Sequence, residues 1–134
     1  MKKFLNHIFI DGLSGMAFGL FATLIIGTII QQIGNLMPGS IGNYLVLFGK
    51  MASAMTGAGI GVGVACKFKE SALVSLSAAT AGMVGGFAGK IIAGTVFADG
   101  VVTLAGPGEP LGAFIAAMVA IELGHIVSGK TKID

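Results

Sequence analysis

The sequence has little charge and no arginine, and both features exclude broad classes of protein. Charged residues make up 10% of the 134 residues, hydrophobic residues make up 54%, and the mean hydropathy is +0.94. A water-soluble domain of this size could not cover so much apolar surface with so few polar side chains. Eight lysines against six acids give a formal net charge of +2, without the concentrated basic face that binds nucleic acid. We therefore expect lipid to be the solvent for much of the chain, and no nucleic-acid partner.

Cysteine and the common catalytic motifs are also scarce or absent. Cys66 is the single cysteine, so no intramolecular disulfide can form, and its neighbour Lys67 indicates a reducing, cytoplasmic edge. The sequence contains no phosphate loop of the Walker type, no dinucleotide fingerprint and no hydrolase elbow. We therefore expect no catalysis by this chain, no catalytic residue and no cofactor.

Four apolar runs are long enough, or nearly long enough, to cross a bilayer. At ~1.5 Å per residue, a helix of about 20 residues covers a hydrocarbon core of roughly 30 Å. The fourth run is the shortest of the four and lies near the lower limit of that length. We expect an all-α membrane protein that forms one membrane domain, with about four transmembrane helices over residues 9–30, 41–66, 71–98 and 111–127.

The segment 99–110, between the third and fourth runs, combines helix breakers with apolar residues. Its glycines and prolines exclude a continuous helix, yet it is too apolar for an ordinary exposed loop. Two interpretations stay open. The segment either dips back into the membrane as a re-entrant stretch, or forms an external turn.

Six lysines outside the apolar runs predict the orientation of the chain. They lie before the first run, between the second and third, and after the fourth: Lys2, Lys3, Lys67, Lys69, Lys130 and Lys132. With four spans, all three segments fall on one side of the membrane, and cytoplasmic segments retain positive charge. We therefore expect a multi-pass protein of the bacterial plasma (inner) membrane with both termini in the cytoplasm.

Small residues recur at four-residue spacing in every run. The pairs are Gly15/Gly19, Gly57/Gly61, Gly59/Gly63, Gly82/Gly86, Gly85/Gly89 and Ala120/Gly124. This spacing is typical of membrane helices that pack closely together. The alternative is that one of the pairs lines a path for a substrate.

Lys50 and Lys90 are the first candidate binding residues, because a charge inside a span is costly unless it is paired or faces a polar cavity. If the second and third spans are antiparallel, the two lysines lie at nearly the same depth. Together they could hold an anionic or strongly hydrogen-bonding ligand. Alternatively, they pair with Glu109 or Glu122, or extend toward the membrane surface.

Three further residues are candidates for contact with a substrate. Glu122 and His125 lie three residues apart and so share a helix face, which suits a proton relay, a site for sugar hydroxyls or a cavity lining. Glu109 lies in Gly-Pro-Gly-Glu-Pro, where prolines and glycines could hold one carboxylate in a fixed place. His7 is far away in the sequence and no Cys/His cluster occurs, so we expect no metal site.

Three stretches of the sequence resemble a known family. They are residues 11–30 (Asp-Gly-Leu-Ser-Gly-Met-Ala-Phe-Gly-Leu-Phe-Ala-Thr-Leu-Ile-Ile-Gly-Thr-Ile-Ile), residues 49–52 (Gly-Lys-Met-Ala) and residues 106–113 (Gly-Pro-Gly-Glu-Pro-Leu-Gly-Ala). Together they are similar to the N-terminal part of the phosphotransferase-system EIIC-like membrane proteins, the group that includes the perfringolysin O regulator type. The resemblance covers nearly the whole chain.

This resemblance implies a membrane permease component of a sugar phosphotransferase system. Such a component binds a sugar or related polyol and moves it inward, while soluble partners supply the phosphoryl group from phosphoenolpyruvate. The phosphorylated side chain would belong to a partner. Glu109 would then be the first residue to test for hydrogen bonding to the substrate.

The length of the chain departs from the resemblance, because permease components of this kind are generally much longer. A transport path normally needs two repeats around a midplane site, whereas four helices make one bundle. We therefore expect either a homo-oligomer or half of a longer permease. Two other functions stay open: a non-transport membrane regulator or assembly module, and an oligomeric channel in which a ring of lysines would favour anions.

Overall fold

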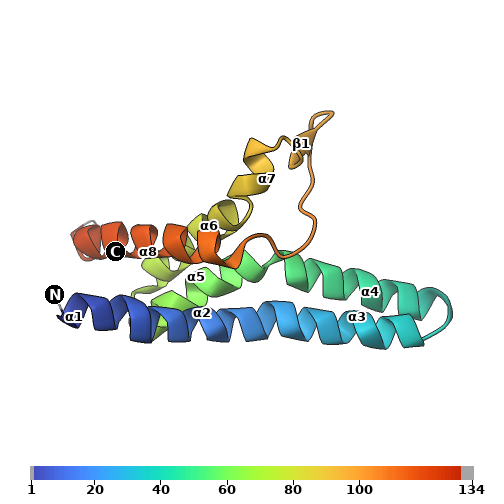
Figure 1. The fold of residues 1–134 in the computed structure, drawn as a ribbon, viewed down its shortest axis with the longest axis horizontal. Helices are drawn as coiled ribbons and strands as arrows, with labels where there is room; N and C mark the ends of the chain where they lie inside the picture. Colours follow the sequence, from blue (N-terminus) through green and yellow to red (C-terminus); the bar gives the residue numbers. More distant parts are fainter. Residues whose placement is uncertain (1, 131–134) are drawn as a thin grey trace.

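The computed structural model describes residues 2–130, and most of this range is helical (Figure 1). The first 35 residues of the range form one continuous helix, Lys2–Leu36. It comprises α1 (Lys2–Asn6), α2 (Leu13–Leu20) and α3 (Ile26–Leu36), joined by the π-helical segments η1 (His7–Gly12) and η2 (Phe21–Ile25). At ~1.5 Å per residue this helix is about 52 Å long, so it exceeds the thickness of a hydrocarbon core.

The chain then reverses at Met37 and Pro38, and α4 (Gly39–Ala54) lies antiparallel beside α3 (Figure 1). Met55 interrupts the helix, and α5 (Thr56–Lys67) leaves at an angle of 50° to α4. At the break, the Thr56 hydroxyl donates a hydrogen bond to the Ser53 carbonyl at 2.6 Å. A side chain thus satisfies a backbone group at the end of α4.

From Ser71 to Lys130, the structure has three more helices and a small hairpin. The helices are α6 (Ala72–Gly86), α7 (Ala88–Ile92) and α8 (Pro110–Val127). The Ser71 hydroxyl accepts a hydrogen bond from the Val74 backbone N–H at 3.3 Å and so caps the start of α6. Pro110 opens α8, where its missing N–H costs nothing, and Gly129, with φ of 78°, lies just beyond the end of α8.

The segment between α7 and α8 contains an antiparallel hairpin of β1 (Phe97–Ala98) and β2 (Val101–Val102). Phe97 pairs with Val102 and Ala98 pairs with Val101. Asp99 and Gly100 form the connecting turn with φ of 52° and 76°, as a tight hairpin turn of the Asp-Gly type requires. The part of segment 99–110 nearest α7 is therefore a β-turn and strand.

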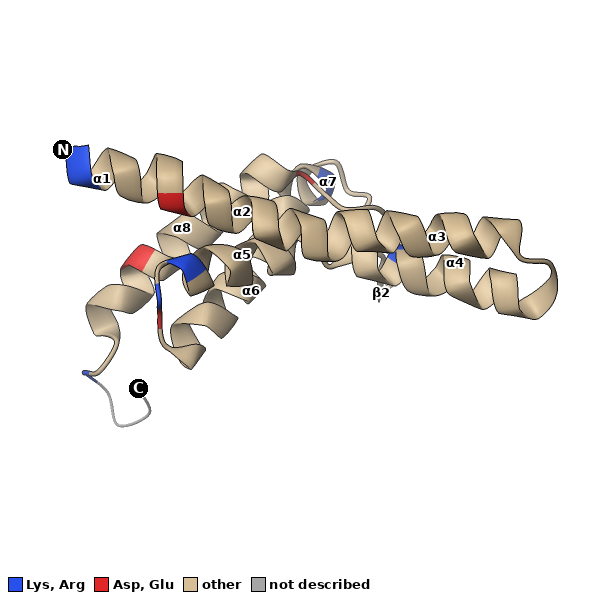
Figure 2. Ribbon diagram, turned by 90° about the horizontal axis from the view of Figure 1, so that it is seen from below, with Lys and Arg blue, Asp and Glu red and all other residues tan. Residues whose placement is uncertain are grey.

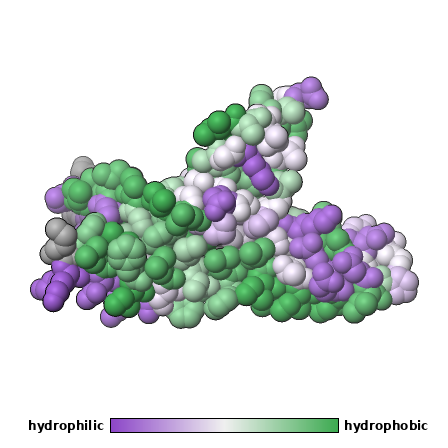
Figure 3. All heavy atoms as spheres, in the orientation of Figure 1, coloured by the Kyte–Doolittle hydropathy of each residue, from purple (hydrophilic) through white to green (hydrophobic). Residues whose placement is uncertain are grey.

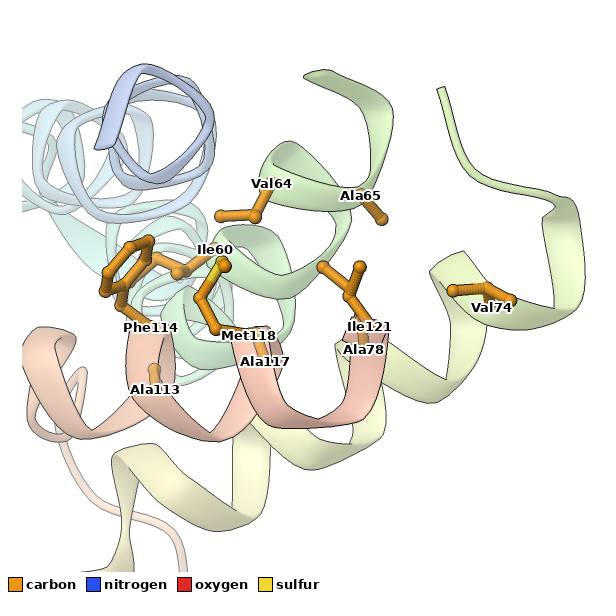
Figure 4. Packing of buried hydrophobic residues seen from close by; sticks show 10 residues of the cluster. All are labelled: Ile60, Val64, Ala65, Val74, Ala78, Ala113, Phe114, Ala117, Met118 and Ile121. Atoms are coloured by element: carbon orange, nitrogen blue, oxygen red, sulfur yellow. The ribbon is translucent and has the colours of Figure 1, made fainter. Parts of the chain in front are cut away.

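The core lies where α5, α6 and α8 meet (Figure 4). Ile60 and Val64 of α5 face Ala117 and Ile121 of α8, and all four side chains are buried. Ala78 of α6 completes the contact between the three helices. Small side chains alternate with branched ones, so the helix backbones approach closely and still fill the space between them.

Backbone contacts at the glycines support the packing interpretation of their spacing. A Cβ atom added to Gly15 of α2 would lie 2.6 Å from the carbonyl oxygen of Gly63 in α5. A Cβ atom added to Gly57 of α5 would lie 2.5 Å from the carbonyl oxygen of Gly82 in α6. Gly89 differs, because nothing lies within 4 Å of its added Cβ. The glycines at these helix contacts therefore bring α2, α5 and α6 together.

The expectation of an all-α membrane protein is confirmed. Among residues 2–130, two helices are long and apolar enough to cross a membrane, Lys2–Leu36 and Pro110–Val127, and the bent pair α4–α5 is a third if it counts as one span. The third expected span, 71–98, differs from the structure: α6 ends at Gly86, α7 ends at Ile92, and β1 follows. At ~1.5 Å per residue, the 15 residues of α6 cover about 22 Å.

Candidate functional site

A cavity of about 630 Å³ lies where η2, α3 and α4 meet the segment 104–107. Its walls combine apolar side chains with a few polar ones: Leu24, Thr28, Gln31, Leu47, Lys50, Met51, Ser53, Ala54, Leu104, Ala105, Gly106 and Pro107. The 50° bend between α4 and α5 lies at one edge of this cavity, at Ala54. Residues more than 50 positions apart in the sequence therefore form one concave surface.

The long first helix contributes two polar side chains to the cavity, Thr28 and Gln31. Both lie on the same stripe of the helix as Leu24, at positions i, i+4 and i+7. The Thr28 hydroxyl donates to the Leu24 carbonyl at 2.8 Å, and the Gln31 amide nitrogen donates to the Ser53 hydroxyl at 3.2 Å. Ser53 is only 5% exposed, so this bond fixes a polar contact between α3 and α4.

Lys50 lines the same cavity, one turn before Ser53 on α4. The hairpin of α3 and α4 contains no other charged residue, and Figure 2 shows it tan apart from one blue stretch. Within residues 2–130, the ion pairs join histidines to glutamates and none involves Lys50. The sequence placed Lys50 in a polar environment or a pair, and the structure places it at the cavity.

Hydrophilic atoms gather on one side of the α3–α4 hairpin, and hydrophobic atoms run along its lower edge in Figure 3. The polar residues of these two helices include Gln31, Gln32, Asn35, Asn43 and Lys50. The hairpin therefore presents two chemically different surfaces, as a helix pair between lipid and a polar cavity would.

Lys90 and Lys50 both lie near the segment 104–107, but their environments differ. Its ammonium donates a hydrogen bond to the Ala105 carbonyl and lies 5.5 Å from the centre of the Phe87 ring. Lys90 is not among the residues that line the cavity. The two lysines that the sequence placed at one depth both adjoin segment 104–107, yet only Lys50 faces the cavity.

Glu109 anchors the cavity wall through its backbone. Its N–H donates to the Gly86 carbonyl at 2.6 Å, at the end of α6. Gly108 lies against the same carbonyl with φ of 75°, and an added Cβ there would lie 2.6 Å from the oxygen. The Glu109 carboxylate is exposed at the start of α8, where the helix dipole favours negative charge, and it does not line the cavity.

Glu122 and His125 lie on the later turns of α8 and bind to different partners. Glu122 Oε1 lies 3.0 Å from His7 Nε2, and the His7 ring stacks on Phe68 with 3.7 Å between ring centres. His125 Nδ1 lies 3.1 Å from a carboxylate oxygen of Glu70. The structure therefore does not bring Glu122 and His125 into the cavity with Lys50, and their shared helix face leads to two separate contacts.

A second, apolar hollow of about 420 Å³ lies between the first helix and α8. Glu122 lies at its edge, and the rest of its lining is hydrophobic: Phe4, Ile8, Phe114, Ile115, Met118, Val119 and Leu123. Over residues 2–130, no three His, Cys, Asp or Glu side chains form a group that could hold a metal ion. The cavity at Lys50 is thus the candidate site with polar chemistry.

Sequence reasoning missed Thr28, Gln31 and Ser53. Their spacing carried a signal, because Thr28 and Gln31 share one helix face, and Lys50 and Ser53 share another. What the spacing could not show is that the two faces meet, since Gln31 and Ser53 are 22 residues apart.

A family model described as "Phosphotransferase system, EIIC" matches residues 10–134. The match begins within the first helix and includes the α4–α5 pair, the segment 104–109 and α8. No curated protein and no solved structure matches the chain.

Proposed function

Because the chain belongs to the phosphotransferase system EIIC family of membrane transport components, we propose that it serves as the membrane permease component of a phosphoenolpyruvate-dependent sugar phosphotransferase-type system. In this proposal it binds a carbohydrate-like solute and passes it across the bacterial inner membrane. The phosphoryl-carrying residue belongs to a soluble partner, and the chain itself catalyses no reaction.

The cavity at Lys50 carries this proposal. Its volume of about 630 Å³ falls within the roughly 300–1,000 Å³ of small-molecule sites. Sugars need several hydrogen-bonding groups beside apolar surface for the ring, and the cavity offers Thr28, Gln31 and Lys50 next to Leu24 and Leu47. The Gln31 amide oxygen and the Lys50 ammonium would meet hydroxyl groups of the solute.

The cavity wall at residues 104–107 belongs to a segment that is held at two points. Lys90 holds it at Ala105, and the Glu109 backbone holds it at Gly86. A wall tied by two hydrogen bonds can release a bound solute when those bonds open, without unfolding of α6 or α8. We propose that this wall closes the cavity on one side.

The orientation of the chain is also part of the proposal. Lys67, Lys69 and Lys130 lie at the ends of α5 and α8, and Figure 2 shows charged stretches gathered around these helix ends and the N-terminus. We propose that this end faces the cytoplasm, where the soluble phosphotransferase components would dock.

A matched pair of threonine variants tests solute binding. Thr28 and Thr80 are both exposed, and each hydroxyl donates to the carbonyl four residues earlier, but only Thr28 lines the cavity. A panel of radiolabelled sugars and polyols is titrated onto the chain in lipid nanodiscs. We expect saturable binding that weakens at least threefold in Thr28→Val and is unchanged in Thr80→Val. Equal affinity in both variants, or no binding of any panel member, would count against this function.

Assembly into a larger unit is proposed as well, either as a homo-oligomer or with a second half. The observation that favours it is the exposed apolar surface of the α3–α4 hairpin, which includes Leu36, Ile41 and Tyr44. Native mass spectrometry of the lipid-embedded chain measures this directly. A stable dimer supports the homo-oligomer, and a persistent monomer excludes it. A partner that co-purifies without any solute binding would instead favour a membrane assembly module.

A further inference from the structure

Lys50 is a charged side chain of the bent α4–α5 pair, and within residues 2–130 it has no ion-pair partner. It is one of the cavity-lining residues. The α3–α4 hairpin, residues 26–54, contains no Asp or Glu at all. A cation within a membrane-spanning segment needs a partner charge or a polar cavity, because its transfer into hydrocarbon is costly.

The neighbours of Lys50 do not supply negative charge. Gln31 and Ser53 are neutral and already bonded to each other, and the Ala105 carbonyl accepts from Lys90. Glu109, the nearest acid in sequence to the cavity wall, is not among the lining residues. The cavity therefore combines one unpaired ammonium with neutral polar groups. We expect the electrostatic potential inside it to be positive.

The two lysines at the segment 104–107 consequently have different roles. Lys90 is a positioning residue, because its ammonium is bonded to the cavity wall and lies over the Phe87 ring. Lys50 has no such bond and is available to a ligand. The charge that compensates Lys50 would then come from the solute.

We propose that the solute bound in this cavity is an acidic sugar, whose carboxylate contacts the Lys50 ammonium while Gln31 and Thr28 contact its hydroxyls. This inference rests on the proposed function, and it narrows the substrate class from carbohydrates in general to those with an anionic group. A charge-assisted hydrogen bond of this kind is stronger than one between neutral groups. Selectivity for the acid over an uncharged analogue of the same shape follows from it.

The test compares acids with neutral analogues that differ at one group. D-glucuronate and D-galacturonate are titrated calorimetrically onto the full chain in phosphatidylcholine nanodiscs, beside D-glucuronamide, D-galacturonamide, D-glucose and D-galactose. We expect at least one acid to bind ten times or more tightly than its amide. Lys50→Met should remove this preference, and Lys50→Arg, which keeps the charge, should retain it.

Lys130→Met is the matched control, because Lys130 lies beyond α8 and outside the cavity. It should leave the preference unchanged. The same titration in phosphatidylglycerol nanodiscs separates two sources of the anionic group. If the lipid headgroup occupies the site, acid binding is lost in these discs, and the solute proposal is overturned.

The remaining outcomes separate this inference from the proposed function. Neutral sugars that bind as tightly as the acids, with Lys50→Met unchanged, would overturn the acidic-sugar inference and leave solute binding intact. No binding of any compound would overturn both. An acid preference that survives in Lys50→Met would assign the anionic group to another residue and refute the role of Lys50.

Discussion

Gly15→Ala provides a sharp test of how this bundle is held together. Gly15 on α2 is buried against α5, and an added Cβ would lie 2.6 Å from both the Gly63 carbonyl oxygen and the Val64 Cα. Both of these atoms belong to backbone, so no side chain can rotate away. Since ordinary contacts begin near 3.4 Å, α2 and α5 would have to separate by several tenths of an ångström.

The magnitude follows from two opposing effects. Overpacking costs about 1–3 kcal/mol, and replacement of a helical glycine by alanine returns up to about 1 kcal/mol. Gly89→Ala is the control, because nothing lies within 4 Å of its added Cβ and only the favourable effect applies. We therefore expect the free energy of unfolding of Gly15→Ala to be about 1–3 kcal/mol lower than that of Gly89→Ala.

Thermal unfolding of both variants in the same lipid nanodiscs, followed by far-ultraviolet circular dichroism, measures the difference. At roughly 4 °C per kcal/mol, the value at which the ranges for shorter and longer domains meet, the midpoint of Gly15→Ala should lie about 4–12 °C below that of Gly89→Ala. Equal midpoints, or a higher midpoint for Gly15→Ala, would show that α2 and α5 do not pack through their glycines.

Three further predictions concern the cavity wall, the orientation and the core. Lys90→Met removes the hydrogen bond to the wall, so backbone amides in 103–109 should exchange with deuterium at least several times faster, as mass spectrometry would show. Cys66 is exposed at the proposed cytoplasmic end, so a membrane-impermeant maleimide should label it only after cells are permeabilised. Ile121→Ala, at 1% exposure, should destabilise the fold by roughly 2–5 kcal/mol, whereas Leu123→Ala, at 61%, should cost far less; chemical unfolding measures both.

Controls sharpen these three experiments. Lys130→Met should leave exchange in 103–109 unchanged, and equal exchange in Lys90→Met and the unaltered chain would refute the anchoring role of Lys90. In a Cys66→Ala background, Ser40→Cys at the α3–α4 turn should be labelled on intact cells. Labelling of Cys66 from outside would reverse the proposed orientation. Similar losses in Ile121→Ala and Leu123→Ala would contradict the position of the core.

Much of the fold could be predicted from hydropathy and length, because lipid exposure leaves a signal in every apolar run. The positions at which the helices are interrupted could not be predicted in this way. Met55 and Phe87 break helices without a proline, in stretches where glycine and small residues let the backbone bend but do not require it. The bends depend on what packs against each helix, such as the Glu109 backbone at Gly86.

For the hairpin at 97–102, the sequence predicts the absence of a helix but not the presence of strands. Helix breakers in this segment excluded a continuous helix, and the Asp99-Gly100 pair favours a tight β-turn. The flanking strands are only two residues long, however, which is too short for alternation to be recognised in the sequence.

The candidate site was predictable only in part, because pairwise proximity is a tertiary property. Lys50 stood out through its charge alone. Glu122 and His125 share a helix face as the spacing predicts, but their partners His7 and Glu70 lie 115 and 55 residues away in the sequence. No local pattern could show that each side chain would contact a different segment.

In the proposed function, the cavity between α3, α4 and the segment 104–107 holds the solute. Ala54 lines this cavity at the α4–α5 bend, so a single cysteine there, in a Cys66→Ala chain, reports on its occupancy. The rate of maleimide labelling of Ala54→Cys is measured with and without each sugar of the binding panel, beside Ser40→Cys as a position outside the cavity. A sugar that binds in the cavity should slow labelling at position 54 and leave labelling at position 40 unchanged. Equal rates at position 54 with and without saturating sugar, despite measured binding, would place the solute outside this cavity.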